Sequence, residues 1–193
     1  MPCTRQPPRR TSFVDGWWLA LALLLAALAC RAAPAPIRDI RVVQDGSTYV
    51  CDVDMLVAVP QAVAWSVLTD FDHMAHWVPN VRSSRVVQRD SGTITVEQRG
   101  VVKLGIAGFP YATERRIDLH PPAAIHATQT KGSQQRVESL MLLEPEGAGT
   151  HLTYHLELVP SRIAGAVLST STLEQELAEQ FGAIIGEMLR RGR

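Results

Sequence analysis

The chain has 193 residues, of which 46% are hydrophobic and 20% are charged, and its formal net charge is zero. This composition fits one globular domain and excludes a disordered chain, a collagen-like chain and a membrane protein with several spans. Residues beyond 32 carry 15 basic and 18 acidic side chains, a net charge of −3. A slightly acidic body argues against nonspecific nucleic-acid binding, which needs a basic surface.

Residues 1–32 are predicted to be a signal peptide. The segment 17–29 is an uninterrupted apolar run that follows several arginines and precedes small residues. At about 13 residues it is shorter than the roughly 20 residues of a membrane-spanning helix, and it matches the hydrophobic region of a secretory signal. Cleavage is expected after Ala32 or, alternatively, after Ala29. We therefore predict a periplasmic or secreted protein.

The mature form has alternatives that the sequence leaves open. An uncleaved apolar run would hold the domain at the membrane, and lipidation of Cys30 would do the same. In either case the protein would contact a membrane surface. Only Cys51 of the three cysteines is certain to remain after cleavage, so neither a disulfide framework nor a thiolate zinc site is expected.

Hydropathy alternation and turn residues predict the elements of the remaining chain. Residues 33–47 are expected to be a linker, with an additional N-terminal strand as an option, and 48–191 form the folded domain. A first strand with one buried face, which includes Cys51, is followed by two short helices. The predicted strands are 48–59, 81–89, 93–105, 111–119, 123–131, 134–144 and 150–159, and the predicted helices are 60–69, 71–78 and a long C-terminal one.

The C-terminal helix is amphipathic and needs an apolar surface to cover. Apolar residues recur at helical spacing from Leu173 to Leu189, and Thr170 or Ser171 is expected to cap its start. The short breaks between the strands indicate hairpins and hence an antiparallel sheet. The predicted fold class is therefore α+β, with a curved antiparallel sheet wrapped around this helix.

Polar side chains interrupt the apolar rows of four predicted strands. If those rows all face the helix, then Gln98, Arg115, Glu138 and Tyr154 place polar tips in an apolar interior, as in small-molecule sites. Two structural alternatives remain. Arg115 and Glu138 could simply pair with each other, or the register could be shifted by one residue, which would turn a whole row to solvent.

Two segments of the sequence resemble the START-type/Bet v 1-like (SRPBCC) superfamily. The stretch 57–72, which continues into Trp77-Val78-Pro79-Asn80-Val81, is similar to the opening of the polyketide cyclase/dehydrase and coenzyme Q-binding branch. The stretches 138–142 and 149–154 are similar to the late hairpin of that branch, although Leu140 stands where tryptophan is frequent. The resemblance covers residues 48–190.

This resemblance implies a helix-grip fold around a hydrophobic cavity. It also implies that the segment 77–79 and the C-terminal helix flank the mouth of the cavity, which adds Trp77, Tyr111, Leu177 and Phe181 to the predicted ligand contacts. The superfamily includes lipid and quinone carriers and aromatic cyclases. No catalytic residue, metal site or cofactor is implied.

The segment 70–76 contains a second cluster of polar residues. His73 and His76 share one helical face and could chelate a metal, but the glutamate of hydrolytic zinc motifs is missing. Asp70 and Asp72 are natural caps where one helix follows another, so a capped junction is the prediction here. His151 and His155 alternate with apolar residues and are expected on the solvent side of their strand.

These observations predict an exported protein that binds a lipid, isoprenoid quinone or aromatic polyketide in an internal cavity, for sequestration or transfer. One alternative is a cyclase or dehydratase that uses Arg115, Glu138 or Tyr154 as an acid or base. The other alternative is a protein-interaction module without a ligand. The sequence contains no nucleophile motif, dinucleotide fingerprint or phosphate loop.

Overall fold

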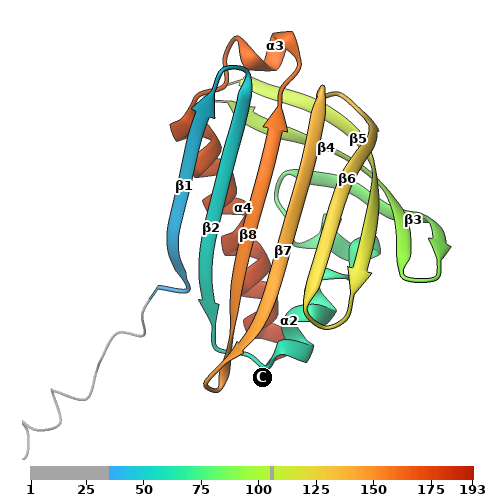
Figure 1. Ribbon diagram of the computed structural model, residues 1–193, viewed down its shortest axis with the longest axis vertical. Helices are drawn as coiled ribbons and strands as arrows, with labels where there is room; N and C mark the ends of the chain where they lie inside the picture. The colour runs from blue at the N-terminus through green and yellow to red at the C-terminus, as the bar shows by residue number, and fades with distance from the viewer. Residues whose placement is uncertain (1–34, 105–106) are drawn as a thin grey trace, which may run out of the picture. The chain divides into compact units, whose positions relative to one another are not determined.

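The computed structural model describes residues 35–104 and 107–193, which form one antiparallel sheet with helices on its inner face (Figure 1). The order of the eight strands is β1-β2-β8-β7-β6-β5-β4-β3. The strands are β1 Ile37–Asp45, β2 Thr48–Val57, β3 Val81–Asp90, β4 Thr93–Leu104, β5 Ala107–His120, β6 Ala124–Gly132, β7 Arg136–Glu146 and β8 Gly149–Val159.

The helix α4, Thr170–Arg191, lies along the inner face of the sheet and buries an apolar stripe against it (Figure 1). Two short elements, α2 Gln61–Leu68 and the 3₁₀ helix η1 Phe71–His76, follow β2, and α3 Arg162–Gly165 follows β8. The predicted helix-grip fold is confirmed. The N-cap of α4 is Ser169, one residue before the expected positions, and its hydroxyl accepts a hydrogen bond from the Thr172 amide at 3.2 Å.

The N-terminal strand that the sequence left as an option is β1. It pairs with β2 through a hairpin, and Val42 on its inner side is buried in the core. The strand therefore contributes to both the sheet and the apolar layer beneath it.

The strand β5 begins four residues earlier than predicted and includes the expected break at residues 108–110. Pro110 pairs with Val101 of β4, whereas β6 pairs with β5 only from Thr113 onwards. Pro110 thus lies where β5 has a single hydrogen-bonded neighbour, and a residue without an amide hydrogen is tolerated there. The predicted break is therefore wrong: residues 108–110 lie within β5, in a segment that pairs with β4 only.

Cys51 is fully buried in β2, as its position on the apolar face predicted. Burial raises the pKa of its thiol to about 12. The side chain therefore stays protonated at physiological pH and acts as a small apolar group in the core.

No helix in the described part of the chain is both long and apolar enough to cross a membrane. The predicted signal peptide, residues 1–32, lies outside the described residues.

Candidate functional site: a cavity between the sheet and the C-terminal helix

A cavity of about 510 Å³ lies among the inner face of the sheet, α3 and α4. This volume falls within the range of about 300–1,000 Å³ that is usual for small-molecule sites. Most of its wall is apolar, with side chains such as Phe71, Ile117, Met141, Leu156 and Ile184. The cavity is therefore a candidate site for a hydrophobic ligand.

Five of the eight residues predicted as ligand contacts line this cavity: Gln98, Tyr111, Arg115, Tyr154 and Phe181. They come from three strands and from α4. The inner rows predicted for 93–105, 111–119 and 150–159 thus face the helix, and the structure places their polar members together. Their contact with a ligand stays a prediction.

A buried hydrogen-bonded chain links three strands at the cavity wall. Arg115 of β5 donates through Nη2 to Oε1 of Gln98 in β4. The Gln98 amide nitrogen donates to Oγ of Ser84 in β3 at 3.0 Å and lies 3.4 Å from Sδ of Met74. Because both ends of the Gln98 amide are engaged, its oxygen is held toward Arg115.

Two tyrosines add hydroxyl groups to the wall. Tyr154 packs its ring edge-on against Phe181, with the ring centroids 5.0 Å apart. Burial raises the pKa of both Tyr154 and Tyr111, while the positive charge of Arg115 acts in the opposite direction on each. Both phenols therefore remain neutral hydrogen-bond donors at physiological pH.

The structure corrects the predicted position of Glu138. Directly paired residues of antiparallel strands point to the same side of a sheet, and Glu138 pairs with Glu157 while Met141 pairs with Tyr154. Glu138 therefore lies on the outer face, where its carboxylate is 3.0 Å from Nε2 of His126. The inner row of β7 is Val137, Ser139, Met141 and Leu143, one residue out of step with the prediction.

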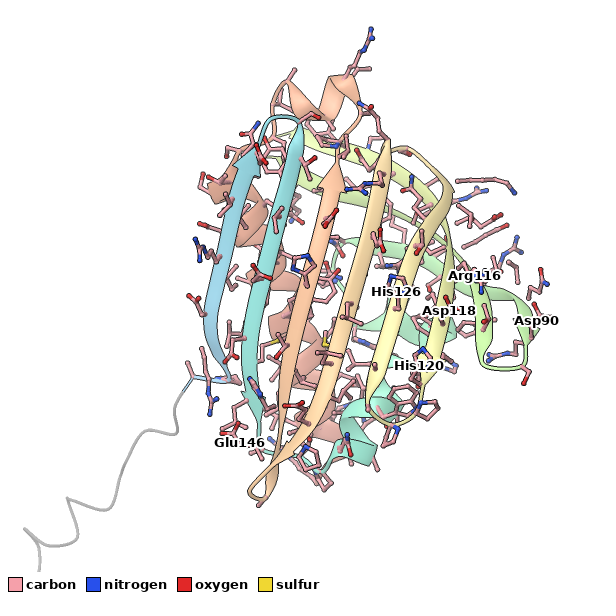
Figure 2. The ribbon with its side chains drawn as sticks, viewed as in Figure 1. Asp90, Arg116, Asp118, His120, His126 and Glu146 are labelled. Atoms are coloured by element: carbon pink, nitrogen blue, oxygen red, sulfur yellow. The ribbon has the colours of Figure 1, made fainter. Side chains whose placement is uncertain are left out.

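The outer face of the sheet is a charged surface (Figure 2). Figure 2 labels Arg116, Asp118 and His126 on β5 and β6, where Asp118 accepts hydrogen bonds from Thr93 and Arg116. His151 and His155 lie on this face as expected and contact the carboxylates of Asp54 and Asp52 at 2.6 and 2.7 Å. These pairs line the solvent side of β2 and β8.

Residues 57–181 match the family described as polyketide cyclase/dehydrase and lipid transport. The chain belongs to this family. No curated protein matches the sequence significantly. The branch of the family that binds coenzyme Q is not singled out by the match.

Solved structures agree on the fold. The chain is similar to the Zhui aromatase/cyclase of a Streptomyces strain, with a TM-score of 0.63, 20% identity and coverage of 76% of this chain and 96% of the other. It is also similar to a STAR-related lipid transfer protein of Xanthomonas axonopodis, with a TM-score of 0.56, 12% identity and coverage of 78% and 98%. A START superfamily protein of Mycobacterium smegmatis has a TM-score of 0.58, 13% identity and coverage of 74% and 96%.

In this family member, Trp77 and Leu177 lie outside the cavity wall, contrary to the prediction. The ring of Trp77 is covered by the guanidinium of Arg191, whose carbon lies 5.0 Å from the ring centroid. Leu177 is buried in the core one helical turn from each of the lining residues Leu173 and Phe181. Both side chains therefore serve the packing of α4 and not the cavity.

Arg191 also joins the end of α4 to the junction between α2 and η1. Its Nε lies 2.6 Å from Oε1 of Glu187, and its Nη2 lies 2.7 Å from Oδ2 of Asp70. The Asp70 side chain caps no helix, contrary to the prediction, and instead contacts Arg191 and Nδ1 of His73, the latter at 2.6 Å. We call Asp70, Trp77, Glu187 and Arg191 the C-terminal clamp.

The polar residues of the segment 70–76 hold neighbouring elements together. Asp72 accepts a hydrogen bond from the Val86 amide at 2.7 Å, which fixes η1 to β3. His73 and His76 stack with their ring centroids 5.8 Å apart. Within residues 35–104 and 107–193, no three histidine, cysteine, aspartate or glutamate side chains gather into a metal-binding group.

The ion pairs of Glu187 are expected to make the domain less stable at acid pH. Hydrogen bonds from Arg190 and then Arg191 lower the pKa of Glu187 from 4.5 to about 2, although burial opposes them. A lowered pKa in the folded state stabilises the protein fully above pH 4.5, and this contribution is lost as the pH falls toward 2. We expect the free energy of unfolding to decline more steeply over this range in the wild type than in Glu187→Gln, as measured by urea titration.

The matched control for this pH experiment is Glu97→Gln, which removes the carboxylate of an exposed pair with Arg85. Exposed pairs contribute little to stability, so this variant should follow the wild-type curve. Parallel curves for the wild type and Glu187→Gln would contradict a stabilising role of the Glu187 carboxylate.

Sequence reasoning missed the part of the wall that α3 and the segment after it contribute. Ile163, Ala164 and Leu168 line the cavity, and Ile163 is also 76% exposed. Ser161 caps α3 by accepting a hydrogen bond from the Ala164 amide. A serine directly after Pro160 was the available signal of a helix start, but a helix of four residues leaves no periodicity to detect.

Proposed function

We propose that the chain is an exported binding protein that holds a hydrophobic small molecule, such as a lipid, isoprenoid quinone or aromatic polyketide, for sequestration or transfer. The cavity of about 510 Å³ carries this proposal, because its wall is mainly apolar with a few polar groups from Gln98, Arg115 and Tyr154. Burial of apolar ligand surface at about 25 cal/mol per Å² would supply the affinity.

Membership of a family that includes lipid transport supports this proposal. We also propose that the ligand enters and leaves the cavity beside α3. Ile163 belongs to the cavity wall and to the surface at once, and Val167 nearby is 52% exposed. These exposed apolar side chains would let a ligand pass between the cavity and a membrane surface beside α3. Export rests on the sequence of residues 1–32.

Mass spectrometry of the protein purified from its own host, first native and then after organic extraction, tests both parts of the proposal. We expect the loss of the first 29 or 32 residues and the release of one class of hydrophobic compound. A full-length chain would contradict export by cleavage, and a chain that yields no compound would contradict the carrier role.

A cavity-filling variant sharpens the extraction experiment. Ala127 lines the cavity and is buried, whereas its neighbour Thr128 pairs with the outward-facing Glu138. Ala127→Phe should reduce the amount of extracted compound severalfold because the ring occupies ligand volume, and Thr128→Phe should not. Equal amounts from both variants, each checked for folding by circular dichroism, would place the ligand elsewhere.

The cyclase alternative keeps two of its three predicted acid–base candidates, since Glu138 lies on the outer face. Arg115 and Tyr154 share the cavity, and the aromatase/cyclase named above has the same fold. Turnover separates the two functions: a carrier binds its ligand stoichiometrically and releases it unchanged, whereas a cyclase yields a product of altered structure.

A further inference from the structure

Arg115 has an unusual electrostatic environment. Among the described residues that line the cavity, it is the one with a charged side chain. No carboxylate of the described residues lies within 4.0 Å of its guanidinium, whereas several surface arginines are paired. A charge turned toward an apolar interior is costly unless an opposite charge or several hydrogen bonds compensate it.

The hydrogen bonds of Arg115 are incomplete. Its Nη2 donates to Gln98, but its Nε is buried and has no hydrogen-bond partner. Nη1 makes no hydrogen bond to the described residues, and the Arg115 side chain is only partly buried where it lines the cavity. The guanidinium therefore keeps N–H donors for an acceptor in the cavity, and buried polar groups are nearly always satisfied in native structures.

The guanidinium is also held in place before any ligand arrives. Gln98 is 6% exposed, and its amide is oriented by the buried Ser84. A fixed guanidinium loses little conformational freedom on binding, so more of its interaction energy appears as affinity. The neutral phenols of Tyr111 and Tyr154 add further donors to the same cavity.

We propose that the natural ligand is an amphiphile with a carboxylate head, and that Arg115 binds this carboxylate while the apolar body lies between the sheet and α4. This inference rests on the proposed function. The planar fork of arginine matches a carboxylate. A phosphate monoester carries about −1.5 to −2 charges at neutral pH, which one arginine does not balance, whereas a carboxylate carries one.

Calorimetric titration with four probes of equal chain length tests the proposal. The probes are dodecanoate, 1-dodecanol, dodecyl phosphate and dodecyltrimethylammonium, and the protein is the mature chain after organic extraction. We expect dodecanoate to bind about 10- to 100-fold more tightly than dodecanol, because a hydrogen bond to a charged group contributes that much. Dodecyltrimethylammonium should bind more weakly than dodecanol.

Two variants locate the effect. Arg115→Gln should abolish the preference, so that dodecanoate binds no more tightly than dodecanol to this variant. Arg116→Gln is the matched control, since the neighbouring arginine lies on the outer face with Asp118, and it should bind all probes like the wild type. If Arg115→Gln does not fold, the comparison of probes on the wild type still decides.

The outcomes separate this inference from the proposed function. Equal binding of dodecanoate and dodecanol to the wild type would overturn the anionic head and leave the hydrophobic carrier standing. Tighter binding of dodecyl phosphate than of dodecanoate would overturn the carboxylate. Failure of all four probes to bind would overturn the proposed function, and this inference with it.

Discussion

Gly100→Ala should destabilise the domain by about 3 kcal/mol, because the change overpacks a site that has no room for one methyl group. A Cβ at Gly100 would lie 1.9 Å from the carbonyl oxygen of Asn80 and 2.7 Å from the ring of Tyr111. The first contact is with backbone. The Asn80 oxygen is also held in place because it accepts a hydrogen bond from the Val101 amide at 3.0 Å.

The effect of Gly100→Ala should reach the cavity as well. Tyr111 lines it, so a side chain at position 100 that displaces the ring would change the shape of the wall and weaken ligand binding. Urea denaturation measures the stability, and titration with a hydrophobic fluorescent probe measures the binding.

Gly182→Ala is the matched control for this experiment. A Cβ at this exposed position of α4 meets no atom within 4 Å, and alanine favours a helix over glycine by about 1 kcal/mol. This variant should therefore be as stable as the wild type or slightly more so. If Gly100→Ala and Gly182→Ala unfold at the same urea concentration, the close approach of Asn80 to β4 is wrong.

Arg191→Ala should cost about 2–4 kcal/mol of stability, since it removes charged hydrogen bonds from two carboxylates that are largely shielded from water. The side chains of Glu187 and Asp70 are 7% and 22% exposed. The variant leaves both without this partner and uncovers the ring of Trp77. Thermal unfolding of the purified domain checks the expected loss.

Two further variants make the Arg191 experiment specific. Arg85→Ala breaks an exposed pair with Glu97 and should cost less than about 1 kcal/mol. Arg191→Lys keeps the charge but cannot reach Asp70 and Glu187 with a forked group, so it should fall between the wild type and alanine. A loss no larger than that of Arg85→Ala would show that the C-terminal clamp contributes little.

The inner rows of β4, β5 and β8 were predictable because each strand has one clearly apolar face. In β4, Ile94 and Val96 continue into Gln98, so the polar residue could be assigned to the interior by its position alone. Alternation of period two carries this information without any knowledge of the neighbouring strands.

The strand β7 was assigned to the wrong face because both of its faces carry apolar side chains. Leu140 and Leu142 made the outer row resemble a core row, although Leu142 is 37% exposed. The turn held the missing information. Gly147 has a φ of +61° in a two-residue loop that sets Glu146 opposite Gly149, and counting back from this turn pairs Met141 with Tyr154.

Trp77 could not be assigned from its local sequence. Its surroundings depend on Arg191, which is far away in the chain and arrives only when α4 is docked. Contacts of this kind have no periodic signature, so the resemblance to relatives was the sole guide, and it pointed to the cavity mouth. The cavity itself was predictable as a consequence of the fold, but its wall at α3 was not.

The strand order has a consequence for how the domain is made. The strand β2 lies between β1 and β8, so its hydrogen bonds join residues such as Asp52 and His155, 103 positions apart. Pairings this distant in sequence form slowly. During synthesis the N-terminal hairpin emerges before β8 and α4, and until these elements follow, its apolar side stays exposed to chaperones.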